Sequence, residues 1–286
     1  MQPTERGCRG VRDAQPIDAH VQDFAIGVVG GPTVVIDYAG VRIVSDPTFD
    51  PPGDYGPYHK SAGPAVTIDE LGQVDAVLVS HDSHVDNFDS LGRQFAAKVP
   101  VVLTTPRSAL RLGGNSRGLA PFESFALPPS SDDRTAVIVH AVPAQHGPSD
   151  GAPDENGDIN SEVVGFILQA DGMPSVYVSG DNASILPVVE ISKRFAHIDV
   201  AVLHAGAARV DSKFEGRPLT LTAERAADAA QLLGVSHVVP AHCEGWSLYS
   251  QTPEDVRRAF EDAGIGHRLR YQRPGRWALL GVPPTH

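Results

Sequence analysis

Compact apolar runs and polar interruptions alternate along most of the chain, and the lengths of the runs predict strands. Several runs are short and rich in valine and isoleucine, as buried strands are. They cover residues 24–30, 33–47, 74–80, 99–105, 135–144, 163–170, 175–182, 199–206 and 237–246. The second run is interrupted by Ala39-Gly40, which predicts a hairpin of two strands that ends at Asp46-Pro47.

Stretches with apolar residues at helical spacing predict helices. They cover residues 108–114, 187–195, 221–234 and 252–264. The last stretch carries a full set of end signals: Thr252 as N-cap, Asp255 to complete a capping box, and Gly264 as the stop. These signals predict a helix whose ends are well defined.

Strand-rich segments that each give way to helices predict one layered α/β or α+β domain. We expect residues 1–20 to form a flexible tail and residues 21–286 to form a single domain. Two long polar loops, 48–63 and 147–162, are candidates for lids or binding loops, because unstructured loops of that length are uncommon without a function.

Composition narrows the class of protein. The net charge of −12 disfavours a nucleic-acid surface, which needs a concentrated basic face. No apolar stretch approaches the roughly 20 residues that span a bilayer, and the N-terminus lacks the apolar core of a secretory signal. The cysteines are Cys8, in the expected tail, and Cys243, so a reducing compartment is favoured. We therefore expect a cytoplasmic protein with no nucleic-acid or membrane partner.

Possible metal ligands cluster where the predicted strands end. They are His81, Asp82, His84 and Asp86, then His146, Asp181 and His242. A single histidine in such a place would be an ordinary loop residue. Several strand-end positions with ligand-type side chains are harder to dismiss, because strand ends in layered folds converge on one edge.

The ordered set of motifs resembles the metallo-β-lactamase-fold superfamily of metal-dependent hydrolases. That family has an H-x-H-x-D-H motif after a strand, then an isolated histidine, an aspartate in a "GD" turn and a C-terminal histidine. This chain has "SHDSHVDNFD", "PAQHG", "SGDN" and "PAHCEGW" in the same order. The early "SDP" at residues 45–47 also resembles the lactonase-like and phospholipase-D-like branch.

The resemblance implies an α+β fold, a four-layer αββα sandwich with a metal site at one edge. The implied ligands are His81, His84, Asp86, His146, Asp181 and His242, with Asp181 shared between two metal positions. Zn²⁺ is the expected ion, with Mn²⁺ or Fe²⁺ as alternatives, because imidazole and carboxylate ligands suit borderline-soft cations. Asp86 and Asp181 are the expected catalytic residues.

Two features depart from the family motif. Counting back from Asp86, the first histidine should be residue 82, which is an aspartate, whereas His81 lies one residue earlier. Either the chain bulges around Ser83 and keeps both His81 and His84 in the site, or Asp82 replaces the first histidine. We favour the bulge. Asn87 stands where the family has a histidine, so we expect one tight metal and a second that is weak or absent.

The implied activity is hydrolysis of a small ester, lactone or phosphodiester by a metal-bound hydroxide. The alternative is a metal-binding or ligand-sensing protein with little catalytic activity, and a redox di-iron centre is less favoured. His204 could lie near the site or be structural. Trp246, Tyr249 and Arg209 could contact substrate, although packing and a surface ion pair are the commoner uses.

Overall fold

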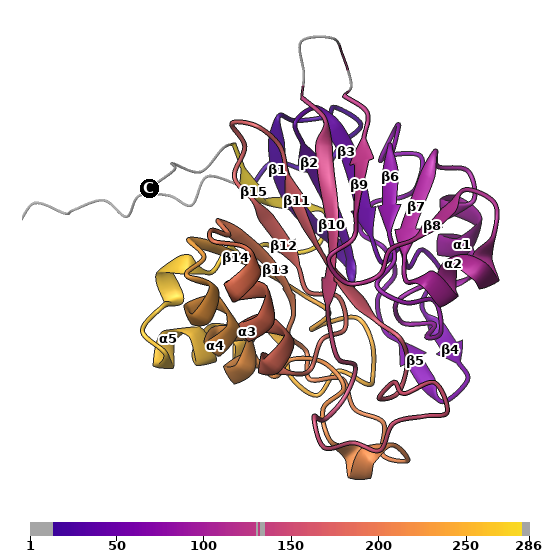
Figure 1. Cartoon of the computed structure of the whole chain (residues 1–286), viewed down its shortest axis with the longest axis vertical. Coiled ribbons are helices and arrows are strands. Elements are labelled where there is room, and N and C mark those ends of the chain that lie inside the picture. The colour runs from indigo at the N-terminus through magenta and orange to yellow at the C-terminus, as the bar shows by residue number, and fades with distance from the viewer. Residues whose placement is uncertain (1–13, 130, 132–134, 282–286) are drawn as a thin grey trace, which may run out of the picture.

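Two β-sheets lie face to face, and helices cover their outer sides (Figure 1). The computed structural model describes residues 14–129, 131 and 135–281. Within them, the first sheet runs in the order β15 (Arg276–Leu280), β1 (Phe24–Gly30), β2 (Thr33–Tyr38), β3 (Val41–Ser45), β6 (Ala76–Leu78), β7 (Val101–Thr104) and β8 (Ser116–Gly118). The second runs β14 (His237–Ala241), β13 (Val200–His204), β12 (Val176–Val178), β11 (Val164–Gln169), β10 (Val137–Pro143) and β9 (Ser124–Leu127).

The space between the sheets is filled by one apolar core that takes residues from both. Because successive side chains of a strand face opposite ways, β2 contributes to two layers. Ile36 packs between the sheets, and Val35 packs on the outer side of the first sheet. The hairpin between β2 and β3 turns at Ala39 and Gly40, which both have positive φ values, 51° and 82°. The predicted hairpin is confirmed.

Helices on the two outer faces complete the four layers. Figure 1 shows α1 (Ser90–Ala96) and α2 (Pro106–Leu112) beside the first sheet, and α3 (Ile185–Arg194), α4 (Ala223–Leu233) and α5 (Pro253–Asp262) beside the second. Phe95 of α1 and Phe260 of α5 are buried in these two outer layers. The αββα sandwich implied by the resemblance is therefore confirmed.

The predicted N-terminal tail differs from the structure in its second half. Residues 1–13 lie outside the described part. Ile17, however, is buried, and its backbone N–H donates to the carbonyl of Gly275 at 3.1 Å. The Arg42 guanidinium donates to the backbone carbonyls of Asp18 and His20. Residues 14–20 thus pack against the sheet. The sequence does not predict this, because Ile17 is a single apolar residue in an otherwise polar stretch.

The two long loops lie at the edge where the candidate residues gather. Residues 48–63 contain a small hairpin, β4 (Gly53–Tyr55) and β5 (Tyr58–Lys60). The 147–162 loop is tied to the start of α2, because Arg107 forms ion pairs with Asp158 and Glu162. Among the described residues, none of the helices has both the length and the apolar content needed to cross a bilayer.

Candidate metal centre

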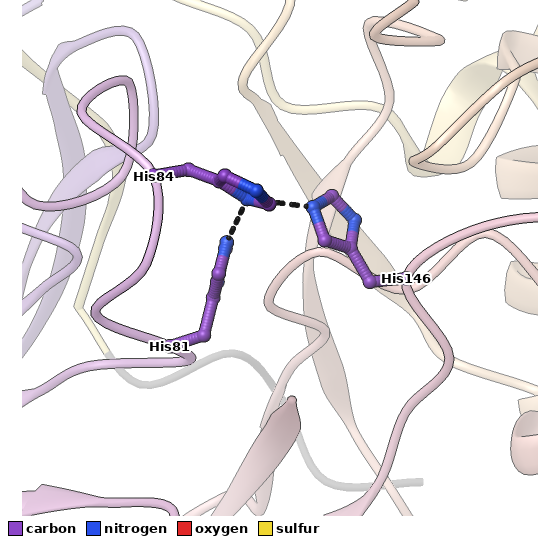
Figure 2. Close-up of side chains that lie close together, drawn as sticks. All are labelled: His81, His84 and His146. Atoms are coloured by element: carbon purple, nitrogen blue, oxygen red, sulfur yellow. Dashed lines mark hydrogen bonds between the residues drawn. The ribbon is translucent and has the colours of Figure 1, made fainter. Parts of the chain in front are cut away.

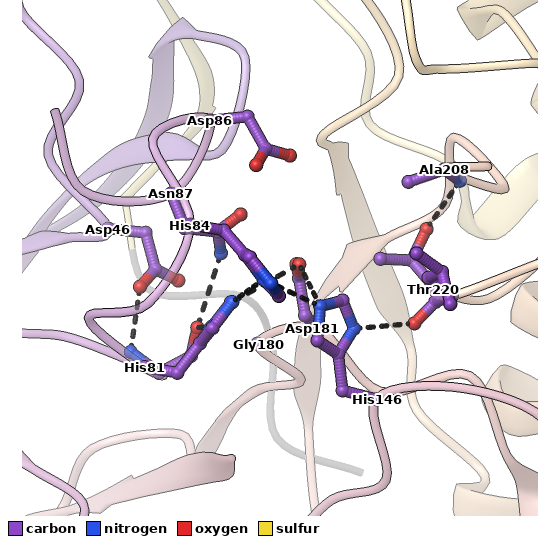
Figure 3. A network of polar contacts seen from close by, with 12 residues as sticks. Asp46, His81, His84, Asp86, Asn87, His146, Gly180, Asp181, Ala208 and Thr220 are labelled. Atoms are coloured by element: carbon purple, nitrogen blue, oxygen red, sulfur yellow. Dashed lines mark hydrogen bonds and ion pairs between the residues drawn. The ribbon is translucent and has the colours of Figure 1, made fainter. Parts of the chain in front are cut away.

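Segments that follow four strands bring polar side chains to one edge of the sandwich (Figure 3). His81 follows β6, His146 follows β10, Asp181 follows β12 and His242 follows β14. β10 and β12 each pair antiparallel with β11, and β12, β13 and β14 are parallel, so β10, β12 and β14 all end at the same edge. Side chains far apart in the sequence therefore meet there.

Three imidazoles form what we call the three-histidine cluster, His81, His84 and His146 (Figure 2). Nδ1 of His84 lies 2.8 Å from Nε2 of His81 and 3.0 Å from Nε2 of His146. A neutral imidazole has one donor and one acceptor nitrogen, so the single Nδ1 atom of His84 is a poor hydrogen-bond partner for both neighbours. Three ring nitrogens that converge on one point are the arrangement expected of ligands around a cation.

The surroundings of the cluster keep it neutral and oriented. Burial lowers the pKa of all three histidines, that of His84 to about 4. His146 Nδ1 lies 2.8 Å from the carbonyl of Leu219 and must donate to it, so Nε2 carries the lone pair and faces the cluster. This is how proteins usually orient a ligating histidine.

The chain bends at Asp82 and Ser83, so His81 and His84 face the same point. Asp82 turns the other way and accepts hydrogen bonds from Ser108 Oγ at 2.8 Å and Arg111 Nε at 3.1 Å. Burial would raise the pKa of Asp82, but the hydrogen bonds from Arg111 and Ser108 lower it. This arrangement corresponds to the register with a bulge at Ser83, in which Asp82 forms an ion pair with Arg111.

A second group of polar atoms surrounds His242. Its Nε2 lies 3.2 Å from Asn87 Oδ1, 3.3 Å from Asp86 Oδ2 and 3.4 Å from Asp181 Oδ1. Asn87 Nδ2 donates to Ser80 Oγ at 3.3 Å, which orients the amide oxygen toward His242. Three oxygen atoms share one nitrogen that can donate a single hydrogen bond, and two of them belong to buried carboxylates. A cation would balance this surplus of acceptors and charge.

Asp181 lies between the three-histidine cluster and the second group. Its Oδ2 is 3.7 Å from His146 Nε2 and 4.0 Å from His81 Nε2, while Oδ1 faces His242. Burial would raise the pKa of Asp181, but the charge of His242 and the hydrogen bond from His204 hold it well below its usual value. An ionised carboxylate between two groups of ligand atoms fits the shared position that the resemblance assigns to it.

His204 belongs to the second group. The sequence alone did not decide between this position and a structural role. Its Nδ1 lies 2.9 Å from Asp181 Oδ1, and its ring stacks on His242 with centroids 5.0 Å apart. Nε2 of His204 and Nδ1 of His242 are buried, and neither has a hydrogen-bond partner among the described residues. Periodicity placed His204 at the end of a strand, but only the sheet order shows that β13 lies between the strands that carry Asp181 and His242.

Asp46 is a further buried carboxylate that the sequence did not assign to the site. It accepts a hydrogen bond from the backbone N–H of Ser80 at 2.7 Å, and its Oδ2 lies 3.9 Å from His204 Nε2. Burial, together with the charge of Asp181, raises its pKa to about 8. The "SDP" segment at the end of the hairpin is the sequence feature that could have identified Asp46 as a site residue.

The other candidate residues have packing roles. The ring of Tyr249 lies 4.1 Å from that of His242, and Trp246 packs against Tyr55 and under the Lys60 ammonium. Arg209 is exposed and donates to Ser250 Oγ and to the carbonyl of Gly216. Arg209 therefore braces a loop through these two hydrogen bonds.

Comparisons with known proteins identify the family of the chain. The beta-lactamase superfamily domain matches residues 41–243 of the chain. A metal-dependent hydrolase from Rubrobacter xylanophilus is 27% identical over 212 residues, which are 73% of this chain and 80% of that protein. Among solved structures, an isothiocyanate hydrolase from Delia radicum gut bacteria has a TM-score of 0.74 at 21% identity and covers 90% of this chain and 99% of its own.

A second solved structure, a metallo hydrolase from Ignicoccus hospitalis, has a TM-score of 0.65 at 20% identity and covers 89% of this chain and 97% of its own. These two structural similarities show the fold alone. The match to the family domain covers most of the chain and shows the family. The chain therefore belongs to the beta-lactamase superfamily of metal-dependent hydrolases, with the metallo-β-lactamase fold.

Proposed function

We propose that this protein hydrolyses a small ester, lactone or phosphodiester with the help of one tightly bound divalent cation. Zinc is the expected ion. The observation that carries the proposal is the convergence of His81, His84 and His146, whose facing nitrogens lie 2.8 and 3.0 Å apart. A small substrate is favoured over a macromolecule, because the depression that is lined by His84 and His146 together with Tyr58 and Leu248 is narrow.

The three-histidine cluster would hold the tight cation, together with Asp181. When bound, such a cation lowers the pKa of its coordinated water from 15.7 to about 7 and polarises the substrate oxygen. The Leu219 carbonyl fixes the ring of His146, and burial keeps the imidazoles neutral, so the ligand nitrogens already face one point.

Asp86 and Asp181 are the proposed catalytic residues. Asp86 is 3% exposed and lines the depression, so its carboxylate can take a proton from the attacking water and hold it for the leaving group. Asp181, buried between the two groups, orients that water through its charge. Walls formed by Leu219 and Leu248 exclude bulk water, which strengthens these interactions.

The second group would hold a cation weakly. Asp86, Asp181 and His242 are suitable ligands, but Asn87 offers a neutral amide oxygen where imidazole would bind zinc better. Mn²⁺ or Fe²⁺ at this position is an alternative, because oxygen ligands suit harder ions.

The test combines metal analysis with a panel of chromogenic lactones, esters and phosphodiesters. The purified protein should contain about one equivalent of metal, and a chelator should abolish hydrolysis, with zinc restoring it. His146→Ala should lose both metal and activity. His140→Ala is the matched control, because His140 lies on β10, the strand that leads to His146, and its ring packs on Phe195. A protein that hydrolyses these substrates equally well with and without chelator would exclude the proposal.

The alternative function, a metal-binding or ligand-sensing protein with little turnover, is favoured by one observation. Asn87 leaves the second group without a fourth strong ligand beside Asp86, Asp181 and His242. Full metal occupancy with no hydrolysis of any substrate class in the panel would favour this alternative.

A further inference from the structure

Lys213 places an ammonium group beside the three-histidine cluster. The residue lies on the loop between β13 and α4, and its Nζ is 3.5 Å from Nε2 of His84. With Tyr58, Asp86, Leu219 and Leu248, it lines the narrow depression that opens onto the cluster. Nothing in the sequence pattern separates this lysine from ordinary surface lysines.

With a cation in the three-histidine cluster, the contact between Lys213 and His84 would join two donors. Nδ1 of His84 is directed at the nitrogens of His81 and His146, so a cation held there would take its lone pair and leave the proton on Nε2. The ammonium of Lys213 has only donors as well. Two donors 3.5 Å apart cannot bond to each other, but both can donate to one oxygen atom placed between them. The depression thus presents a site for a hydrogen-bond acceptor.

Lys213 forms no ion pair among the described residues, although the charge of Asp86, which lines the same depression, acts on its ammonium. Its Nζ donates to the neutral amide oxygen of Asn160 at 2.6 Å. In the part of the chain that the structure describes, no carboxylate lies within ion-pair distance of it, whereas the nearby Arg217 is paired with Asp150. A half-buried ammonium with a neutral partner favours an acceptor that carries negative charge.

The backbone around Lys213 is held in an unfavourable conformation. Phe214 and Glu215 follow it with φ values of 49° and 58°, and Asn160 has a φ of 69°. Arg217 Nε donates to the carbonyl of Phe214 at 3.1 Å and Arg209 donates to that of Gly216 at 3.3 Å, so two arginines brace the turn. Strained backbone of this kind persists where surrounding contacts impose it, and it is concentrated at functional sites.

We propose that Lys213 is a substrate-binding residue that selects a small substrate with a negatively charged oxygen group, a carboxylate or a phosphate. His84 Nε2 supplies the second hydrogen bond to that group. Asn160 positions the ammonium, and Leu219 and Leu248 contact the apolar part of the substrate. This inference rests on the proposed function, because it places the anionic group of the substrate next to the proposed metal ligands.

The test measures binding of two probes, inorganic phosphate and acetate, by isothermal titration calorimetry of the metal-loaded protein. Lys213→Met should weaken the binding of one probe by roughly 10- to 100-fold, as expected for loss of a hydrogen bond to a charged group. The affected probe identifies the class of anion. Lys213→Arg, which keeps the charge, should retain most of the affinity, and Lys193→Met on the exposed side of α3 should leave it unchanged. Lys213→Gln is the second uncharged variant if Lys213→Met does not fold.

The metal content of each variant is measured alongside, and it should equal that of the wild type. Equal binding of both probes by the wild type and Lys213→Met would overturn the inference, as would a wild type that binds neither probe. If the wild type takes up no metal, the proposed function fails, and the titration is then performed on the metal-free chain. Anion binding that is lost in Lys213→Met under those conditions would still support the assignment of Lys213.

Discussion

The amide oxygen of Asn87 lies 3.2 Å from Nε2 of His242, facing the same point as the carboxylates of Asp86 and Asp181. The side chain occupies the place where the resemblance expects a histidine. Its orientation is set by the hydrogen bond from its own Nδ2 to Ser80 Oγ. The departure from the family motif therefore puts a neutral amide oxygen, in place of an imidazole nitrogen, among the polar atoms around His242.

Replacing the amide with an imidazole should strengthen the second metal position. We expect Asn87→His to raise the zinc content from about one equivalent to about two, because zinc prefers imidazole nitrogen to a neutral amide oxygen. Inductively coupled plasma mass spectrometry of dialysed protein measures this. Asn156→His, on the exposed 147–162 loop, is the control for an added histidine. An unchanged stoichiometry in folded Asn87→His would mean that Asn87 does not limit the second position.

His81 and Asp82 should respond differently to alanine substitution. His81→Ala should lose the tight metal, because it removes one of the three converging nitrogens. Asp82→Ala should keep the metal and instead lower the free energy of unfolding, since Arg111 and Ser108 lose a shared acceptor. Metal content and urea unfolding of the two variants separate these effects. Loss of metal in Asp82→Ala with retention in His81→Ala would support the opposite register.

Much of the fold was accessible from local patterns. The hairpin at Ala39-Gly40 was predictable because strand-like runs lie on both sides of it, and α5 was predictable because Thr252 and Asp255 form a capping box that the structure contains. By contrast, β15 has no local signal. Its five residues become a strand by pairing with β1, at the other end of the chain. Helix α1 has only seven residues, too few to show a clear periodicity.

The residues of the candidate site also differ in whether the sequence identifies them. His81, His84, His146, Asp181 and His242 were identifiable because each follows an apolar run, and strand ends meet at a sheet edge. Lys213 was not identifiable, because it reaches the cluster on a loop whose path depends on contacts with Asn160 and two arginines. A pattern along the chain carries no information on which loop folds over which strand end.

Metal should stabilise the folded chain against heat and denaturant. A ligand that binds only the folded state adds about 4 kcal/mol at a free concentration 1,000 times its dissociation constant. We therefore expect zinc to raise the midpoint of thermal unfolding of the wild type and of His140→Ala, and to have little effect on His146→Ala. Differential scanning calorimetry with and without a chelator measures the shift. Equal stabilisation of His146→Ala would show that zinc binds elsewhere on the chain.

Breaking the buried ion pair between Arg42 and Asp37 should lower the free energy of unfolding without changing the metal content. Both side chains are fully buried, and the guanidinium bonds both carboxylate oxygens, at 2.7 and 2.8 Å. Arg42→Met should cost about 3–5 kcal/mol, because Asp37 then keeps an unpaired charge in the interior.

The double variant Arg42→Met with Asp37→Asn should be more stable than Arg42→Met alone, since it removes the stranded charge. It should remain less stable than the wild type, because Arg42 also holds the backbone carbonyls of Asp18 and His20. Urea unfolding of the metal-free proteins gives the free energies, and Arg258→Met, on the exposed side of α5, is the control. If the double variant were the less stable of the two, the carboxylate of Asp37 would be satisfied by other contacts, such as the N–H of Gln22 at 2.8 Å.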